Sequence, residues 1–414
     1  MIEKINYVVM CLFFICYSYQ FFYILVSWLR KPKPHKPEVY HRIAVLIAAR
    51  NEQTVIGNLI DSIKAQDYPA ELLDIYLVAD NCTDGTAEEA RRHGATVFER
   101  HDISHVGKGY ALKFLLEQVD KTAMKAHDAY LVLDADNVIS SDFVTEINRT
   151  YTDGYEIVTC YRNSKNYGDN WISAGYALWF LRESRYLNGA RTLLGNSCAV
   201  SGTGFLFSRR ILEKCGGWHY FLLTEDIEFS VDNIVRGEKI GYASGAVLYD
   251  EQPVSFAQSW RQRMRWSRGY LQVIVRYGRE LIKGIFRGDF SCFDMTMNIC
   301  PAAVLTCFSV IINGCAAISN LIGGGSLQSL GISVLTTLTN LYLTMFLVGG
   351  ITTVTEWRSI HCPAYKKLLY VFTFPVFMFT YLPICVASFF KNPQWKPISH
   401  SRNLNLHQIR QNNK

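Results

Sequence analysis

Long apolar runs near both ends of the chain constrain its fold more than any other feature. Residues 5–29 are almost uncharged, and residues 299–321, 330–351 and 368–390 each approach or exceed the roughly 20 residues that span a bilayer as a helix. The hydrophobic share of the 414 residues is 49%, and the excess lies in these runs. The sequence therefore predicts an integral membrane protein with a large domain between its membrane segments.

Charged residues indicate the orientation of that domain. Arg30, Lys31, Lys33 and Lys36 follow the first run directly, whereas a secretory signal carries its basic residues before a shorter apolar core. Because positive charge favours the cytoplasmic side, we expect a retained helix followed by a cytoplasmic domain. The net charge of +6 fits a membrane surface and phosphate ligands rather than nucleic acid, since the basic residues cluster beside the apolar runs.

The twelve cysteines include no Cys-x-x-Cys pair, and most of them lie in apolar segments. Zinc sites and disulfide frameworks require closer or more regular spacing. We therefore expect buried thiols in a reducing compartment.

Between about residues 43 and 247, short apolar strands alternate with helical stretches. The predicted strands cover residues 43–48, 75–78, 96–99, 130–133, 157–160, 204–208 and 240–243. This alternation predicts an α/β fold with a mostly parallel sheet covered by helices on both faces. Ligands bind at the carboxyl ends of the strands in such sheets, so the polar turns there are the candidate site.

The turn after residues 130–133 carries Asp134-Ala135-Asp136. In an extended chain the two carboxylates share a face, and together they can hold Mg²⁺ or Mn²⁺ beside a phosphate. A polar turn at the end of a strand would account for the same residues. Asp-x-Asp therefore needs support from the other turns.

The turns after the first two strands carry further polar residues. Asn51 is a candidate helix cap, and Glu52 follows it directly. Asp80 can accept hydrogen bonds from a nucleobase or a ribose. Asp84 and Thr86 are better explained as the start of the next helix.

Three later motifs also have both a structural and a functional interpretation. Gly107-Lys108-Gly109 precedes a helix and suits a phosphate, although the spacing of a Walker loop is absent. Ser201-Gly202-Thr203-Gly204 opens a strand and allows close approach of a flat ligand, or marks a bulge. Thr224-Glu225-Asp226 starts an amphipathic helix, where acids are favourable at the N-terminus without any catalytic role.

Residues 255–283 mix aromatic and basic side chains and include Gln262-Arg263-Met264-Arg265-Trp266. A basic amphipathic helix of this kind is typical of a membrane surface or of a partner-binding element. We expect a helix at the membrane interface. Trp266 there offers a flat face for a ring, or simply anchors the helix in the interface.

Together these motifs resemble the family-two processive glycosyltransferases, which include cellulose, mixed-linkage glucan, hyaluronan and poly-N-acetylglucosamine synthases. The resemblance rests on Asp80, the Asp134/Asp136 pair, Thr224-Glu225-Asp226 and Gln262-x-x-Arg265-Trp266, in this order and between membrane segments. It covers residues 43–270, about half of the chain. Each motif is weak alone, and the ordered set is specific.

The resemblance implies a GT-A fold and a role for each motif. Asp226 is the implied general base, with Thr224 and Glu225 beside it. The implied donor-binding and metal-binding residues are Glu52, Asp80, Lys108, Asp134, Asp136, Gln262, Arg265 and Trp266, with Mg²⁺ or Mn²⁺ on Asp134 and Asp136. The implied acceptor-binding residues are Ser201, Gly202, Thr203, Gly204 and Trp266.

The chemistry of these residue types agrees with the implied reaction. A sugar hydroxyl is a poor nucleophile, so Asp226 would take its proton as the oxygen attacks the anomeric carbon. The departing diphosphate needs positive charge, which a metal and Arg265 would supply. A single displacement inverts the anomeric centre and gives a β-linkage from an α-linked donor. Glycoside hydrolysis by two carboxylates explains neither the Arg-Trp signature nor a site tied to the membrane.

We therefore expect a processive enzyme in a bacterial plasma membrane that polymerises a β-glucan from UDP-glucose, with 1,4 or mixed 1,3;1,4 linkages, and extrudes it. The alternatives are a poly-N-acetylglucosamine-type synthase, a non-processive glycosyltransferase acting on a lipid, and a non-catalytic membrane scaffold. The expected partners are the UDP-sugar, the growing glycan and the bilayer. Because few spans are available for a channel, a homo-oligomer or an accessory subunit is also implied. The chain lacks a Phe-x-Val-Thr-x-Lys segment and a cyclic-dinucleotide domain, which argues against cellulose itself.

The expected organisation is a membrane helix (1–30), a GT-A domain (31–254), an interface helix region (255–290), a membrane region (291–390) and a basic tail (391–414). Three spans after a cytoplasmic domain would put this tail outside, although its basic residues favour the inside. One of the three segments is therefore expected to be interfacial or re-entrant. The segment from Gln394 to His400 is either an interfacial plug or a snorkelling Trp-Lys pair, and Gly323-Gly324-Gly325 is an expected turn.

Overall fold

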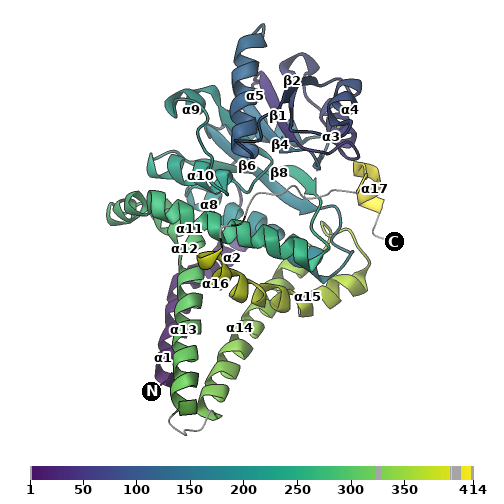
Figure 1. The fold of residues 1–414 in the computed structure, drawn as a ribbon. Helices are drawn as coiled ribbons and strands as arrows, with labels where there is room; N and C mark the ends of the chain where they lie inside the picture. The colour runs from purple at the N-terminus through teal and green to yellow at the C-terminus, as the bar shows by residue number, and fades with distance from the viewer. Residues whose placement is uncertain (1, 323–327, 392, 394–401, 412–414) are drawn as a thin grey trace.

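The computed structural model describes residues 2–322, 328–391, 393 and 402–411 (Figure 1). The expected turn at Gly323-Gly324-Gly325 and the segment from Gln394 to His400 lie outside these residues. The architecture is a sheet with helices on both faces, above a group of long helices that extend away from it (Figure 1). The α/β prediction is confirmed.

The sheet has eight strands in the order β3-β2-β1-β4-β7-β6-β8-β5. Their bounds are β1 (Ile43–Ala49), β2 (Leu73–Asp80), β3 (Thr96–Arg100), β4 (Ala129–Asp134), β5 (Val138–Ile139), β6 (Ile157–Ser164), β7 (Phe205–Ser208) and β8 (Ile240–Asp250). The strands β1 to β4 pair in parallel, whereas β7 is antiparallel to both of its neighbours and β5 is antiparallel to β8. All seven predicted strands are present, and the short β5 is an additional strand.

Alternate residues of the central strands pack against opposite layers of helices. Ile43, Val45 and Ile47 of β1 are fully buried against α3 (Ile56–Lys64), α4 (Thr86–Arg92) and α6 (Phe143–Thr152). Ala44 and Leu46 face the layer of α5 (Lys108–Thr122), α7 (Trp171–Arg182) and α10 (Glu225–Val235). Each fully buried Ile or Leu contributes about 1.5–3 kcal/mol, so this two-sided burial fixes the sheet.

The expected cap at Asn51 is wrong. The helix α3 begins five residues later, with Val55 at its N-cap position and no side-chain capping bond. Asn51 instead adopts a left-handed φ of 59°, and its Oδ1 accepts a hydrogen bond from the backbone N–H of Thr83 at 2.8 Å. The residue thus joins two turns at the edge of the sheet. Asp84 and Thr86 do start α4, as expected, since Asp84 Oδ1 accepts a hydrogen bond from the N–H of Thr86 at 3.1 Å.

The apolar runs form long helices on one side of the sheet domain. They are α1 (Ile2–Tyr17), α2 (Tyr19–Leu29), α13 (Pro301–Ile322) and α14 (Gln328–Thr355). In Figure 1, α1, α13 and α14 extend away from the sheet domain. Among the described residues, three segments are long and apolar enough to cross a membrane: Lys4–Leu29, Leu330–Thr355 and Ala364–Phe390. A fourth candidate is the pair of α12 (Phe290–Ile299) and α13, which is bent by 42°.

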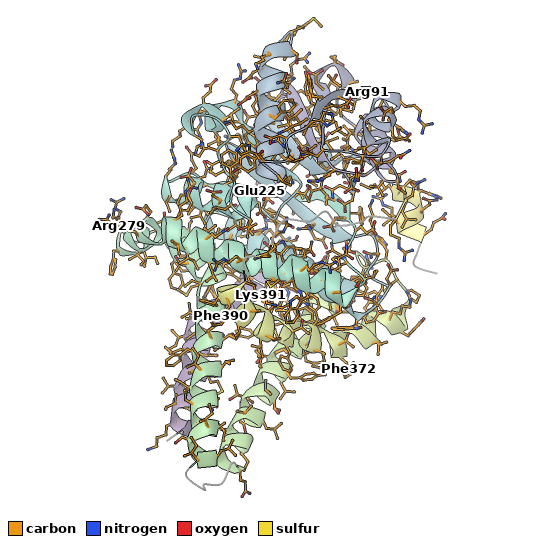
Figure 2. All side chains as sticks on the ribbon, viewed as in Figure 1. Arg91, Glu225, Arg279, Phe372, Phe390 and Lys391 are labelled. Carbon is orange, nitrogen blue, oxygen red and sulfur yellow. The ribbon has the colours of Figure 1, made fainter. Side chains whose placement is uncertain are left out.

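The last apolar run has a different direction from the others. Its helices α15 (Ala364–Phe379) and α16 (Tyr381–Phe390) lie beneath α11 (Phe256–Phe286) and run across the direction of α13 and α14 (Figure 1). One face packs on the domain, where the rings of Phe377 and Tyr176 are 5.1 Å apart. Phe372 is 57% exposed and lies on the underside of α15 (Figure 2). The helix pair thus has one face packed on the domain and another that is exposed.

The end of the chain returns to the sheet domain. The helix α17 (Leu406–Gln411) buries Ile409 against Val138 and Tyr249, and Arg402 forms an ion pair with Asp169 at 2.9 Å. The tail and the sheet therefore lie on the same side of the long helices. That one of the last three apolar segments is interfacial or re-entrant stays a prediction, since Ala364–Phe390 is itself long and apolar enough to cross a membrane.

Candidate active site

Most of the predicted site residues line one cavity of 1040 Å³ at the carboxyl ends of β1, β2 and β4. The predicted residues in its lining are Glu52, Asp80, Lys108, Asp134, Asp136, Ser201, Gly202, Thr224, Glu225, Asp226, Gln262, Arg265 and Trp266. Two predicted residues are excluded from it. Thr203 is buried behind the end of β4, and Gly204 packs so closely on Cys160 that a Cβ would lie 2.3 Å from its sulfur. Neither residue lies in the cavity lining, and their expected acceptor role stays a prediction.

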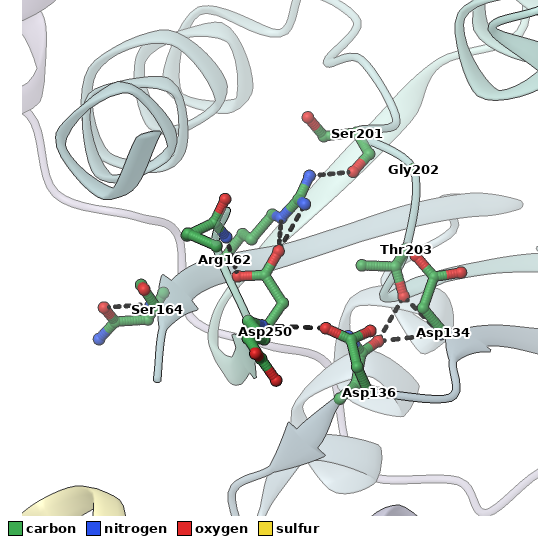
Figure 3. Close-up of polar contacts among 12 residues, drawn as sticks. Asp134, Asp136, Arg162, Ser164, Ser201, Gly202, Thr203 and Asp250 are labelled. Atoms are coloured by element: carbon green, nitrogen blue, oxygen red, sulfur yellow. Dashed lines mark hydrogen bonds and ion pairs between the residues drawn. The ribbon is translucent and has the colours of Figure 1, made fainter. Parts of the chain in front are cut away.

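The Asp-x-Asp motif is held rigidly at the end of β4 (Figure 3). The backbone N–H of Asp134 donates to Thr203 Oγ1 at 2.9 Å and to Asn137 Oδ1 at 3.0 Å. Asp136 is buried, and its Oδ2 accepts a hydrogen bond from the N–H of Glu251 at 2.9 Å. Both carboxylates thereby keep fixed positions at the cavity wall.

Lys108 shows where this wall accommodates a positive charge. It begins α5, forms an ion pair with Asp134, and donates a hydrogen bond to the carbonyl oxygen of Gly202 at 2.7 Å. No group of three or more His, Cys, Asp or Glu side chains with metal-binding geometry occurs among the described residues. Mg²⁺ commonly binds to one or two carboxylates together with substrate phosphates and water, so the Asp134/Asp136 pair fits a metal that arrives with a diphosphate.

Asp80 is paired with a residue that the sequence analysis missed. Its Oδ1 accepts a hydrogen bond from Arg100 at 2.5 Å, and both side chains are buried. Burial raises the pKa of Asp80, and the bond and charge of Arg100 oppose this rise. Asp80 and Arg100 are register partners on β2 and β3, so the pairing of the two strands was the missing signal. Arg100 also donates to the carbonyl of His105 at 2.8 Å, which ties Asp80 to the loop before Lys108.

On the nucleotide-binding role that the sequence resemblance implies for Asp80, we expect Arg100→Leu to weaken UDP binding by about tenfold, the usual scale for losing one charge-assisted hydrogen bond. Without the guanidinium the pKa of Asp80 rises further, so the loss grows as the pH falls. Calorimetric titration with UDP at several pH values measures both effects. Arg100→Lys, which keeps the charge, should retain more of the affinity, and equal affinity in Arg100→Leu and the wild type would contradict this role of Arg100.

Thr224, Glu225 and Asp226 lie at the start of α10, where α11 passes very closely. A Cβ on Gly269 of α11 would lie 2.5 Å from the Thr224 side chain, so only glycine fits there. Burial and the neighbouring Asp226 raise the pKa of Glu225 to about 7. Burial also raises the pKa of Asp226, and the N–H of Ile227, Lys108 and Arg265 oppose the rise. A carboxylate with a raised pKa is a stronger base, as the predicted role requires.

The helix α11 supplies the Gln-x-x-Arg-Trp residues to the same cavity. Gln262 Oε1 is buried and has no hydrogen-bond partner among the described residues, so it is available to a ligand. Trp266 packs edge-on against Tyr176 at 5.7 Å and Phe180 at 6.2 Å, inside the cavity rather than on an outer surface. Arg263 points away from the cavity and donates a hydrogen bond to Thr380 Oγ1 at 2.6 Å. This bond joins α11 to the junction of α15 and α16.

A second ion pair beside the Asp-x-Asp motif also escaped the sequence analysis (Figure 3). Arg162 donates through Nε to Asp250 Oδ2 at 2.7 Å and through a terminal nitrogen to the carbonyl of Ser201 at 2.7 Å. Its guanidinium lies 3.7 Å from the centre of the Phe180 ring. Arg162 therefore fixes the loop of Ser201 and Gly202 against the cavity. The two residues come from β6 and β8, and no local motif marks them.

Comparison with known proteins agrees with this geometry. The model of the family described as glycosyltransferase like family 2 matches residues 41–269, more than half of the chain. The chain belongs to this family. It has the GT-A fold, and the sequence-based resemblance is confirmed at the level of family and fold.

Relatives within the family have different products in their names. A probable glycosyltransferase, YdaM, of Bacillus subtilis is 26% identical over 58% of this chain and 58% of its own length. A beta-monoglucosyldiacylglycerol synthase of Nostoc sp. is 24% identical over 66% of this chain and 60% of its own. A poly-beta-1,6-N-acetyl-D-glucosamine synthase of Staphylococcus aureus is 25% identical over 65% of each. The chain thus matches about three fifths of the length of these relatives.

A solved structure resembles almost the whole chain. The mannosyltransferase PcManGT from Pyrobaculum calidifontis, in complex with GDP-Man and Mn²⁺, covers 94% of this chain and 98% of its own with a TM-score of 0.61. The sequences are 17% identical, so the likeness concerns the fold. It includes the long helices as well as the GT-A domain.

Proposed function

We propose that the protein is an inverting, processive glycosyltransferase that builds a β-linked glycan from a UDP-sugar, with UDP-glucose as donor. One observation carries this proposal. The cavity with Asp80 and Asp226 continues between α1, α13 and α14. Polar side chains line that deeper part, namely Asn298, Thr306, Ser309, Thr337, Asn340 and Thr344.

Polar groups within membrane segments are costly unless they face a cavity or each other. A glycan presents hydroxyl groups along its length, and these can bond to amide and hydroxyl side chains, whereas an acyl chain cannot. These polar groups lie among apolar side chains such as Phe13, Leu341 and Val348, and they are what supports a path for a sugar chain. The donor is made in the cytoplasm, and the basic flank of α2 supports a cytoplasmic position for the GT-A domain in a bacterial plasma membrane.

The proposed reaction is a single displacement. The acceptor hydroxyl attacks the anomeric carbon, its proton passes to Asp226, and the bond between that carbon and the diphosphate oxygen breaks as UDP departs with the electron pair. Asp80 holds the uridine. Arg265 and Lys108 lie at the carboxylates of α10 and β4, where they stabilise the negative charge of the leaving diphosphate. Mg²⁺ or Mn²⁺ on Asp134 and Asp136 would add Lewis-acid stabilisation there.

The pH dependence of the reaction follows from the buried carboxyls. Asp226 acts as a base only when ionised, and burial raises its pKa above the ordinary value of 3.8. We therefore expect kcat/KM to fall as the pH falls through this raised pKa, with an acid limb above 3.8. Initial rates of UDP release between acid and neutral pH measure it. An acid limb at the ordinary value would contradict the assignment of Asp226 as the base.

The proposal is tested by incorporation of label from UDP-[³H]glucose, with UDP-N-acetylglucosamine in parallel, by purified protein with Mg²⁺ or Mn²⁺. High-molecular-weight product from UDP-glucose is the expected result. If polymer forms only from UDP-N-acetylglucosamine, the proposed donor is wrong and UDP-N-acetylglucosamine replaces it. A single-sugar lipid product would replace the proposal by a non-processive lipid glycosyltransferase, the activity named for the Nostoc relative. Cross-linking during the assay tests for a homo-oligomer.

A further inference from the structure

The cavity contains a group of charged residues that the reaction above does not use. The helix α7 ends in a π-helical segment, Glu183–Asn188, and the residues at this junction, Arg182 and Glu183, both line the cavity. π-Helical turns inside helices occur often at functional sites, because the extra residue redirects side chains. Here the irregularity presents two opposite charges to the interior of a cavity.

Glu183 lies next to the proposed base along one loop. Its Oε2 accepts a hydrogen bond from the Ser201 hydroxyl at 3.2 Å. The following residue, Gly202, is in contact with Asp226, since a Cβ there would lie 3.8 Å from Asp226 Oδ2. The other carboxylate oxygen of Glu183 makes no hydrogen bond within the described part of the chain. Glu183 therefore has an acceptor free for a ligand within reach of Asp226.

Tyr270 connects the two carboxylates from the opposite wall. It lies one turn after Trp266 on α11, so both rings are on the same face of that helix and both line the cavity. All three side chains line the same cavity; burial raises the pKa of the Tyr270 hydroxyl, and the charges of Glu183 and Asp226 raise it further. The hydroxyl stays protonated and can donate a hydrogen bond.

Arg182 extends this group towards the long helices. Its guanidinium donates a hydrogen bond to Gln20 Oε1 of α2 and lies 5.0 Å from the centre of the Trp179 ring. Gln20 lines the same cavity. The group of Arg182, Glu183 and Tyr270 thus lies between the catalytic carboxylates and the membrane helices.

We infer that Arg182, Glu183 and Tyr270 form the subsite that binds the terminal sugar ring of the acceptor and aims its hydroxyl at Asp226. A sugar hydroxyl both donates and accepts hydrogen bonds, and this group offers a carboxylate acceptor, guanidinium donors and a phenol. The inference rests on the proposed glycosyltransferase reaction.

The same ring chemistry is present at the end of a β-glycan and in the headgroup of a glycolipid. Two acceptors distinguish these sources: cellotetraose, and monoglucosyldiacylglycerol in vesicles. We expect Glu183→Gln to raise the KM of one of them about tenfold, the scale of one lost charge-assisted hydrogen bond. The Kd for UDP with Mg²⁺ stays unchanged, because Glu183 lies on the acceptor side. The acceptor whose KM rises shows whether the subsite binds the end of a glycan or the headgroup of a glycolipid.

Tyr270→Phe is the second variant, since it removes one oxygen and keeps the ring that packs in the cavity. Glu117→Gln on the exposed surface of α5 is the matched control and should change neither constant. Unchanged KM values for both acceptors in Glu183→Gln and Tyr270→Phe would overturn the subsite. An equal rise in the Kd for UDP would also overturn it, since the residues would then act on the donor.

The failure of the reaction itself is separable from the failure of the subsite. If wild-type protein transfers sugar from neither UDP-glucose nor UDP-N-acetylglucosamine to any acceptor, the proposed function fails. Direct binding of cellotetraose and of the glycolipid vesicles is then compared between wild type and Glu183→Gln. Weaker binding in the variant supports the subsite, and equal binding overturns it.

Discussion

Asp226→Asn lowers kcat by about 10²–10⁴-fold, the range that a positioned general base contributes to proton transfer. The variant keeps the size of the side chain and removes only its capacity to accept a proton. Asp226 lines the cavity next to Gly202, and in the proposed reaction it contacts the acceptor hydroxyl rather than the uridine. The Kd for UDP therefore remains at the wild-type value, and the loss is confined to the chemical step.

UDP release by purified protein under saturating donor measures this loss. Asp120→Asn, an exposed aspartate of α5, is the matched control and should retain full activity. Glu225→Gln distinguishes the two neighbouring carboxyls. A larger loss in Glu225→Gln than in Asp226→Asn would assign the base to Glu225, whose pKa is raised to about 7.

The sequence predicted the positions of those site residues that lie in a single turn at the end of a strand or the start of a helix. Asp80, Asp134 and Asp136 end apolar strands, and Glu225 and Asp226 begin a helix, so local patterns fixed both their positions and their direction. Parallel strands bring such turns to one edge without any knowledge of contacts. The cavity at that edge follows from the α/β pattern alone.

The residues that the sequence did not reveal depend on pairing between distant segments. Arg100 is identified only by its register opposite Asp80, and Arg162 only by its ion pair with Asp250 on another strand. Glu183 lies on a helix that reads as continuous, because nothing in the pattern marks the π-helical turn. The prediction for Asn51 failed because a local pattern has two explanations. Asparagine is a common helix cap, but it also tolerates the left-handed turn position that Asn51 occupies.

The last apolar run, residues 368–390, shows that the sequence pattern does not reveal packing between distant segments in the membrane region either. Residues 368–390 have the length and hydropathy of a span, yet α15 and α16 pack sideways on α7 and α11 through Phe377 and Arg263. Tertiary contacts with a polar domain decide the direction of an apolar helix once its length suffices.

A buried ion pair between Arg191 of α8 (Gly189–Leu194) and Asp294 of α12 has the largest expected effect on stability. Both side chains are 1% exposed. The carboxylate accepts two hydrogen bonds from Arg191, at 2.7 and 2.9 Å. It also accepts one each from Tyr19 and Tyr23 of α2, at 2.7 Å. This group therefore joins the N-terminal helix to the GT-A domain.

Arg191→Met leaves the charge of Asp294 buried without a cation, which costs about 3–5 kcal/mol. We expect a large fall in the midpoint of thermal inactivation in detergent. The matched control removes both charges and both hydroxyls: Arg191→Met with Asp294→Leu, Tyr19→Phe and Tyr23→Phe. Because an apolar replacement of similar volume leaves no buried group unsatisfied, this variant should be more stable than Arg191→Met alone. If the quadruple variant is as unstable as Arg191→Met, the ion pair contributes through packing rather than charge, and α2 is bound to the domain by van der Waals contacts alone.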